Sequence, residues 1–325
     1  MNAPLATVAL RQQALLSLLR YLQDEGYDFV TPTPTTHARV LARDPQRPAE
    51  DLRDAFGWNR PFLPRLLPSA LFAQLHLAAL VEEQGRLWRS RIRVASLGER
   101  LLVHSAYPTS QADAVFFGPD SYRFAAAIQA HLEQRSQRPQ RALEIGCGAA
   151  PGALCIAAAA PQAEVWASDI NPVALELAHI NALFAGAEKL QLRQGSLCDS
   201  VSGSFDLIVA NPPYLLDPER RSYRHGGGEL GLGLSLAMVE AALPRLAPGG
   251  TLLLYTGVAL RGAENPLLSA LGPSLQACGA HWRYRELDPD VFGEELEEPA
   301  YAGVERIAAV LLEVRREPQS PSLHL

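Results

Sequence analysis

The sequence lacks the features that place a protein in a membrane or route it to secretion. No stretch approaches the roughly 20 uninterrupted apolar residues that a membrane-spanning helix requires. The first residues contain no basic segment followed by an apolar block, because Arg11 leads directly into Gln12 and Gln13. We therefore expect a cytoplasmic protein with no membrane partner.

Cysteine is scarce, and its spacing does not match the common cysteine-based sites. The chain contains four cysteines, Cys147, Cys155, Cys198 and Cys278. They form no CxxC pair and no cysteine and histidine pattern typical of zinc. Reduced intracellular thiols are the simplest account of them. We expect no metal site.

Strong positive charge is also missing. Residues 1–110 carry 13 basic and 10 acidic side chains, a net +3, and residues 111–325 carry 16 and 25, a net −9, which together give the formal charge of −6. Neither part has the concentrated cationic face that broad binding to nucleic acid usually needs. The 325 residues are 48% hydrophobic and 20% charged, which is typical of a soluble globular protein with about two domains.

Residues 1–105 are predicted to form a mainly helical, winged-helix-like domain. Apolar periodicity and stop signals predict helices at Leu10–Glu25, Ala49–Phe56 and Ser69–Glu83, and a hairpin of Leu87–Ala95 with Leu101–His104. The segment Thr31–Pro48, rich in proline and threonine, is predicted to be a loop. Arg89, Arg91 and Arg93 alternate with apolar residues, which predicts a solvated hairpin face, with phosphate contact as the alternative. Such domains recognise substrates or nucleic acid, or form homodimers.

A turn of sequence Gly118-Pro119-Asp120-Ser121 precedes the predicted helix Tyr122–Glu133. Free backbone N–H groups at a helix start attract anions, so this turn is a candidate anchor for a ligand carboxylate. Tyr122 is the candidate cofactor contact beside it. The alternative is an ordinary capped helix. The turn lies near the start of the predicted second domain, residues 106–325.

After Arg141, strands and helices alternate, which predicts a doubly wound α/β domain with a Rossmann-like sheet of seven strands. The predicted strands are Ala142–Cys147, Glu164–Ile170, Leu190–Gln194, Phe205–Asn211, Thr251–Thr256, His281–Leu287 and Arg306–Arg315. The predicted helices are Gly152–Ala160, Pro172–Ala185, Leu232–Leu246 and Asn265–Cys278. Only the acidic loop Asp288–Glu305 separates the last two strands, so we expect them to pair antiparallel at the sheet edge.

The first of these strands ends in a glycine-rich turn that contains Glu144, Gly146 and Gly148 and opens a helix. Glycine lets the backbone approach a ligand closely, and the helix start supplies N–H donors. The turn lacks the Gly-Lys-Ser/Thr of a phosphate-binding loop, which disfavours a nucleoside triphosphate. About twenty residues later Asp169 ends the second strand, followed closely by Asn171. Its carboxylate can accept both hydroxyls of a ribose, from a dinucleotide or from S-adenosylmethionine alike.

Two further strand ends carry polar residues. The third strand ends in Gln194-Gly195-Ser196-Leu197, where the backbone and Ser196 can meet an adenine. The fourth ends in Asn211-Pro212-Pro213-Tyr214, a stiff corner that offers carbonyl acceptors under an aromatic ring and so can hold an amino group. All four ends lie on the same edge of a parallel sheet, where open α/β folds bind ligands.

In this order the motifs resemble those of class I S-adenosylmethionine-dependent methyltransferases. The Asn-Pro-Pro-Tyr corner resembles the branch that holds HemK-type protein-glutamine N5-methyltransferases and enzymes that methylate base amino groups of rRNA and DNA. The similarity covers roughly residues 105–315, whereas the residues before it do not look like the release-factor-docking domain of HemK-type enzymes. The resemblance implies S-adenosylmethionine as cofactor. It implies cofactor contacts from Glu144, Gly146, Gly148, Asp169, Asn171, Ser196, Leu197 and Asn211.

By the same resemblance, Asn211 and the Pro212 carbonyl hold the target nitrogen, next to Pro213, and Tyr214 packs on its planar group. The implied reaction is direct transfer of a methyl group to an amide or amino nitrogen, with catalysis mainly by orientation. The acidic second domain favours a protein glutamine or a small molecule over an RNA base. A winged-helix regulatory or assembly protein with a cofactor-sensing domain is the alternative of another class. A NAD-dependent oxidoreductase would leave Asn-Pro-Pro-Tyr unexplained.

Overall fold

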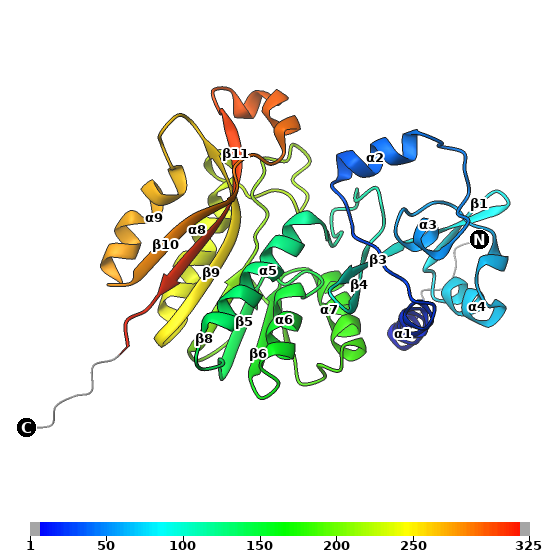
Figure 1. Ribbon diagram of the computed structural model, residues 1–325, viewed down its shortest axis with the longest axis horizontal. Coiled ribbons are helices and arrows are strands. Elements are labelled where there is room, and N and C mark those ends of the chain that lie inside the picture. Colours follow the sequence, from blue (N-terminus) through cyan, green and yellow to red (C-terminus); the bar gives the residue numbers. More distant parts are fainter. Residues whose placement is uncertain (1–6, 319–325) are drawn as a thin grey trace, which may run out of the picture.

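The computed structural model describes residues 7–318, and its centre is a seven-stranded sheet of order β10-β11-β9-β8-β5-β6-β7 (Figure 1). The strands are β5 (Arg141–Ile145), β6 (Glu164–Asp169), β7 (Gln191–Gln194), β8 (Phe205–Ala210), β9 (Leu246–Leu260), β10 (His281–Asp288) and β11 (Arg306–Arg315). Strands β5 to β9 pair parallel, and β11 pairs antiparallel with both β9 and β10. The predicted Rossmann-like sheet and its terminal antiparallel pair are confirmed.

Helices cover both faces of this sheet, because its central strands are apolar on both sides. In β8, Leu207 and Val209 join one buried cluster, and Ile208 and Ala210 join another. The first cluster includes side chains of α5 (Pro119–Gln134), α6 (Pro151–Ala159) and α7 (Pro172–Phe184). The second includes side chains of α8 (Gly233–Ala242) and α9 (Pro266–Ala277). The result is a three-layer α/β/α domain, as near-continuous apolar strands predict.

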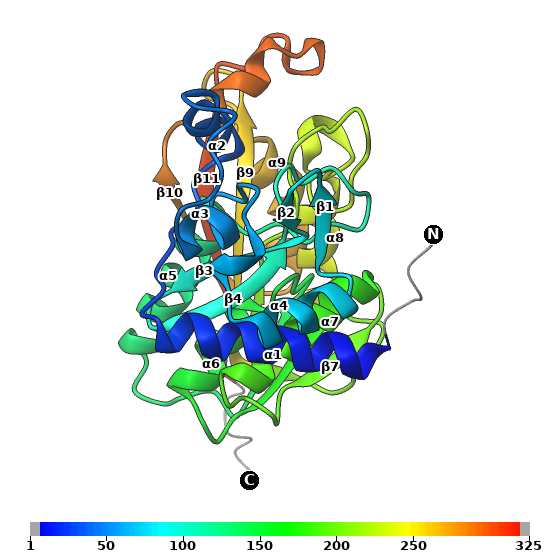
Figure 2. The same cartoon turned by 90° about the vertical axis from the view of Figure 1, so that its right-hand side faces the viewer.

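From residue 7 to residue 105, the N-terminal part contains four α-helices and two separate hairpins, where one hairpin was predicted (Figure 2). The helices are α1 (Val8–Asp24), α2 (Pro34–Ala42), α3 (Leu52–Phe56) and α4 (Ser69–Leu77). The hairpins pair β1 (Val81–Gln84) with β2 (Leu87–Ser90), and β3 (Ile92–Leu97) with β4 (Arg100–Ser105). The single predicted strand Leu87–Ala95 is therefore wrong. It breaks after Ser90, whose hydroxyl bonds the backbone of Ile92.

Two more N-terminal predictions are wrong. Helix α2 lies inside the segment predicted to be a loop, with Pro34 as its first residue and the Thr33 hydroxyl accepting the N–H of Thr36. Proline at the first position and threonine at the cap are helix-start signals. The helix predicted to reach Glu83 ends at Leu77, because Ala79 adopts a left-handed conformation with φ of 55° and the chain turns into β1.

The arginine row of the predicted hairpin is a solvated face only at Arg91, which is exposed and pairs with Glu82. Arg93 is buried and donates to the carbonyl of Ser105, and burial lowers its pKa to about 10. Arg89 donates to the carbonyls of Asn59 and Tyr107. Arg89 and Arg93 thus hold the N-terminal part together, and Arg91 is paired with a carboxylate, so the row gives no support to phosphate binding.

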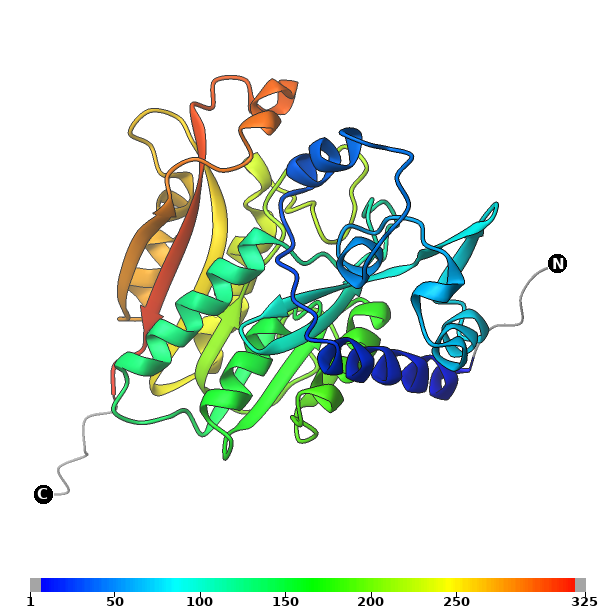
Figure 3. The same ribbon diagram turned by 45° about the vertical axis from the view of Figure 1, so that its right-hand side comes forward.

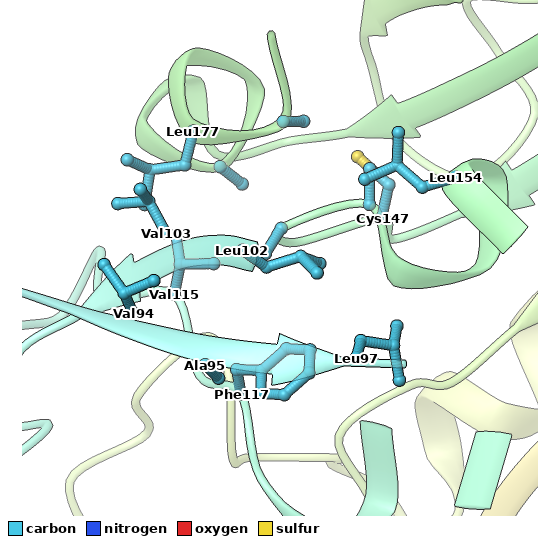
Figure 4. Packing of buried hydrophobic residues seen from close by; sticks show 14 of the residues in the cluster. Val94, Ala95, Leu97, Leu102, Val103, Val115, Phe117, Cys147, Leu154 and Leu177 are labelled. Carbon is cyan, nitrogen blue, oxygen red and sulfur yellow. The ribbon is translucent and has the colours of Figure 1, made fainter. Parts of the chain in front are cut away.

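The N-terminal part packs directly on the sheet domain. The side chain of Asn181 in α7 accepts the N–H of Val103 at 2.8 Å and donates to the Val103 carbonyl at 3.1 Å. Arg11 of α1 forms a 2.8 Å ion pair with Glu176 of the same helix α7. Figure 4 shows Leu102 and Val103 of β4 among the buried side chains that join the two parts, and Figure 3 shows α1, in dark blue, lying against the sheet domain. The N-terminal part is therefore a fixed wall beside the sheet.

Within residues 7–318, no helix is long and apolar enough to cross a membrane.

Candidate active site

A cavity of about 390 Å³ lies at the carboxyl edge of the parallel strands, where the four predicted motifs end. Its lining contains the predicted site residues Gly146, Gly148, Asp169, Asn171, Ser196, Leu197, Asn211, Pro212, Pro213 and Tyr214. The structure thus brings together ten of the twelve predicted residues. Glu144 and Tyr122 are placed elsewhere.

Glu144 supports the glycine-rich turn from below and does not line the cavity. Its carboxylate accepts the N–H groups of Gly152 at 3.1 Å and Ala153 at 2.7 Å, so it caps the start of α6. Burial raises its pKa to about 8, against the effect of these two hydrogen bonds. The predicted cofactor contact is therefore corrected to a support for the turn. Gly146 and Gly148 above it have positive φ angles of 67° and 52°, which favour glycine.

Asp169, at the end of β6, is oriented by backbone donors on both sides. Its Oδ2 accepts the N–H of Gly148 at 2.9 Å, and its Oδ1 accepts the N–H of Asn171 at 2.9 Å. Burial raises the pKa of this carboxyl. Each oxygen keeps a second lone pair, so the fixed carboxylate can accept two hydroxyl groups of a ligand in the cavity.

Asn171 and the end of β7 complete this half of the cavity. The Asn171 side chain accepts the N–H of Val173 at the start of α7 and donates to the carbonyl of Asp113. Leu197 has a left-handed φ of 52°, and its carbonyl accepts the Ser168 hydroxyl at 3.0 Å. These contacts fix the backbone beside Ser196. Ile170 at the rim is 59% exposed and was missed, although an apolar residue next to Asp169 could have been noted.

The Asn211-Pro212-Pro213-Tyr214 corner forms the opposite half. Asn211 is half-buried, and its side chain forms no hydrogen bond with any residue in the described range 7–318. Its amide therefore keeps its donors and acceptor for a ligand. Tyr214 is buried, and its ring lies so close to Gly257 of β9 that a Cβ there would come within 2.1 Å of it. Gly257 is thus needed for the position of the ring.

Asp120 lies beneath Tyr214 and was not predicted as a site residue in its own right. Its Oδ2 accepts the Tyr214 hydroxyl at 2.7 Å, and its Oδ1 accepts the Tyr255 hydroxyl at 2.7 Å. Burial raises its pKa, and the two phenol hydrogen bonds oppose that shift. The Gly-Pro-Asp-Ser turn therefore already contains a carboxylate of the chain itself. This does not favour the prediction that it anchors a ligand carboxylate.

Tyr122 points away from the cavity. Its hydroxyl accepts the N–H of Thr31 at 3.0 Å, and its ring packs edge-on against Phe117. The tyrosine therefore joins α5 to the N-terminal part, which does not fit the predicted cofactor contact. Its neighbours Asp120 and Ser121 line the cavity in its place. Successive side chains on a helix differ in direction by about 100°. The prediction therefore chose a residue next to the lining residues in sequence, but one whose side chain points away from the cavity.

Two loops, one around residues 109–116 and one around residues 222–223, form a roof over the cavity and are joined by hydrogen bonds. The Ser222 hydroxyl donates to the carbonyl of Ala112 at 2.8 Å, and the Tyr223 hydroxyl donates to the carbonyl of Thr109. The rings of Tyr223 and Phe116 lie nearly parallel, with centroids 6.0 Å apart. The loop that carries Tyr223 is fitted to the corner, since a Cβ on Gly231 would come within 2.1 Å of the Tyr214 carbonyl oxygen.

Pro34 of the N-terminal part and Tyr107, just after that part, form a wall of the cavity. The Tyr107 ring stacks on His37 with centroids 4.0 Å apart. Phe292, which packs edge-on against Tyr214, lines the cavity as well. Thr35 of α2 donates to Glu294 at 2.9 Å, so this wall and the Phe292 loop are joined. Sequence reasoning missed these residues because no local motif marks them.

The sheet domain of this chain is similar to known methyltransferases. Residues 124–272 match the family model described as methyltransferase small domain. A release factor glutamine methyltransferase of Deinococcus radiodurans is 39% identical over 172 residues, which cover 50% of this chain and 58% of that protein. One of Xylella fastidiosa is 35% identical over 153 residues, covering 43% of this chain and 54% of that protein. The chain thus spans about half the length of the curated relatives it matches.

Among solved structures, an S-adenosylmethionine-dependent methyltransferase of Agrobacterium tumefaciens aligns with a TM-score of 0.46 and 18% identity, covering 78% of this chain and 80% of that one. The fold assignment rests on the order and direction of the seven strands in this chain.

Proposed function

Since this chain contains a class I methyltransferase domain, we propose that it transfers the methyl group of S-adenosylmethionine to a nitrogen atom of an acceptor. The favoured acceptor is the side-chain amide of a protein glutamine, the substrate class in the names of the relatives. The observation that carries this proposal is the half-buried Asn211 amide, which shares one cavity with the oriented Asp169 carboxylate.

The residues around Asp169 fit S-adenosylmethionine. The two fixed carboxylate oxygens suit the two hydroxyls of a ribose, and the exposed Ile170 offers an apolar surface to an adenine ring. The left-handed turn at Gly146 and Gly148 lets the backbone approach the ligand closely. When bound, this cofactor supplies an electrophilic methyl group on a sulfonium. The chain's own contribution is to place that methyl group facing the Asn211 corner.

At the corner, the proposed mechanism is orientation of a weak nucleophile. The lone pair of an amide or aromatic amine is delocalised, so the nitrogen attacks only when that pair is turned toward the methyl group. The side-chain oxygen of Asn211 and the carbonyl of Pro212 would accept its two N–H bonds, and the ring of Tyr214 would pack on its plane. Holding the reacting atoms in line in this way can contribute about 7 kcal/mol or more.

The N-terminal part, predicted as residues 1–105, is proposed to take part in recognising the acceptor. Pro34 lines the cavity, as does Tyr107 directly after this part, and Thr35 bonds to the loop of Phe292, which contacts Tyr214. This wall is therefore next to the corner that would hold the acceptor nitrogen. A homodimer formed through the same part stays a prediction.

The test is incubation of the protein with methyl-labelled S-adenosylmethionine and, separately, a purified peptide-chain release factor, total RNA and a small-molecule lysate fraction. We expect label in protein, with a mass increase of one methyl group on a glutamine. Asn211→Ala should abolish transfer while the dissociation constant for S-adenosylmethionine stays within about threefold, because one orienting contact can carry several kcal/mol of catalysis.

Gln162→Ala is the matched control, since Gln162 is an exposed amide just before β6, at the opposite edge of the sheet. It should transfer methyl groups like the wild type. Full activity of Asn211→Ala would contradict the assigned mechanism. Label found in RNA or small molecules, with none in protein, would contradict the acceptor class.

A further inference from the structure

Asp120 occupies an unusual position under the acceptor corner. It is the second residue of α5, is 8% exposed and lines the cavity. The hydroxyls of Tyr214 and Tyr255 both donate to it at 2.7 Å, one to each carboxylate oxygen. Two phenol donors suit an ionised carboxylate, which is an acceptor at both oxygens.

The negative charge of Asp120 is only partly neutralised by the residues around it. Arg123 lies 3.4 Å from its Oδ1 but makes a shorter contact of 2.7 Å with Asp288. Arg123 is therefore shared between two carboxylates. In a buried site a charge acts over several ångströms with little screening, so Asp120 contributes negative potential to the cavity beside Tyr214. Arg221 and Arg224, which also line the cavity, are paired with Asp217 and Glu295.

Methyl transfer moves positive charge toward this side of the cavity. The nitrogen lone pair forms the N–C bond while the S–C bond breaks and its electron pair stays on sulfur. The positive charge thereby passes from sulfur to nitrogen, which then loses one of its protons to water. A fixed negative charge next to the acceptor nitrogen stabilises the charge that develops there.

We propose that Asp120 is a positioning and electrostatic residue for this reaction, holding the Tyr214 ring through its hydroxyl and placing a negative charge beneath the acceptor nitrogen. This inference rests on the function proposed above. Tyr255 offers a comparison that distinguishes this role of Asp120 from a purely structural one. Tyr255 makes a hydrogen bond of the same length to the same carboxylate, but it belongs to β9 and is not part of the cavity lining.

The test compares Asp120→Asn, Tyr214→Phe, their double variant and Tyr255→Phe. For each, kcat, the KM for the acceptor, the dissociation constant for S-adenosylmethionine and the urea midpoint are measured. Asp120→Asn should lower kcat on the order of tenfold to hundredfold, the scale of removing one electrostatic contact from an active site. Its cofactor affinity should stay within about threefold. The double variant should be little less active than Asp120→Asn alone, because both changes remove the same hydrogen bond.

Tyr255→Phe should shift the urea midpoint as much as Asp120→Asn while changing kcat far less. An unchanged kcat in Asp120→Asn, or equal losses of kcat in Asp120→Asn and Tyr255→Phe, would overturn the proposal. Should Asp120→Asn fail to fold, Tyr214→Phe removes the same link and leaves the ring in place, and an unchanged kcat in that variant would overturn it as well.

A binding measurement tests the charge without any transfer. The cationic cofactor and its neutral, demethylated thioether differ by one positive charge, so Asp120→Asn should reduce the preference for the cation by about tenfold. If the wild type methylates no acceptor, the proposed function is wrong, and the ratio of the dissociation constants for the two compounds alone decides the role of Asp120. If Asp120→Asn leaves that ratio unchanged, the proposed role of Asp120 is rejected.

Discussion

His37 should make the stability of this protein depend on pH in the mildly acidic range. The side chain is fully buried, its Nε2 donates to the carbonyl of Trp58 at 2.9 Å, and its Nδ1 accepts from Arg93 at 3.3 Å. A proton on Nδ1 would remove that acceptor and set a second positive charge against Arg93. Burial, and after it Arg93, lower the pKa of His37 from 6.5 to about 4.

The direction of this pH effect follows from the protonation of His37 in the folded and unfolded chains. Between about pH 6.5 and pH 4 the unfolded chain binds a proton on His37 that the folded chain does not, so stability falls as pH falls. The loss is small above pH 7, about 2 kcal/mol at pH 5 and about 3 kcal/mol at pH 4. Buried His104, whose pKa is also lowered by burial, acts in the same direction.

Urea unfolding at pH 7.5, 6, 5 and 4 measures this dependence in the wild type and in His37→Gln, whose amide can donate and accept without titrating. The wild type should lose about 2 kcal/mol more than His37→Gln between pH 7.5 and pH 5. His179→Gln, at an exposed position of α7, is the matched control and should behave like the wild type. Equal losses in the wild type and in His37→Gln would refute the reasoning. Because His37 stacks on Tyr107 of the cavity wall, the rate of methyl transfer should also fall as the pH is lowered through this range.

Two further predictions concern the cavity itself. Gly257→Ala places a methyl group within 2.1 Å of the Tyr214 ring, so the rate of methyl transfer should fall at least tenfold. Gly272 has open space around it, so Gly272→Ala should leave the rate unchanged in the same assay. Asp169→Asn should weaken binding of S-adenosylmethionine about tenfold or more in a calorimetric titration, because one acceptor of the fixed carboxylate becomes a donor, while Asp199→Asn at an exposed position should bind normally.

Local pattern was enough to predict one half of the site. The turn at Gly146, the carboxylate of Asp169 and the corner at Asn211 are each written in consecutive residues, and the geometry of a parallel sheet brings such strand ends together. Their meeting in one cavity is confirmed by the structure. The direction in which a side chain points was less predictable than its place in the fold. Glu144 sits in the correct motif but points beneath the turn to cap α6, because its strand alternates inward and outward at every residue.

The missed features depend on residues far apart in the sequence. Asp120 meets Tyr214 and Tyr255 across separations of 94 and 135 residues, and no spacing rule predicts such a contact. In the same way, burial of Arg93 could not be read from an alternating pattern, because that pattern gives the side of a strand but not what packs against it. Helix α2 is a different case, since the Thr33 and Pro34 start signals were present and the proline and threonine content of the segment outweighed them.

The cavity also explains why the cofactor is easier to assign than the acceptor. Gly146, Asp169 and Asn211 all lie within residues 124–272, the range that matches the family model. The wall next to the acceptor corner is built largely from outside that range, by Tyr107 from the segment that follows β4 and by Phe292 from the loop before β11. A chain can therefore keep the machinery that positions a nitrogen and a methyl group while changing the surface that selects the molecule carrying that nitrogen. Exchange of Tyr107 and its neighbours, more than of the corner, is the change we expect to alter the choice of acceptor.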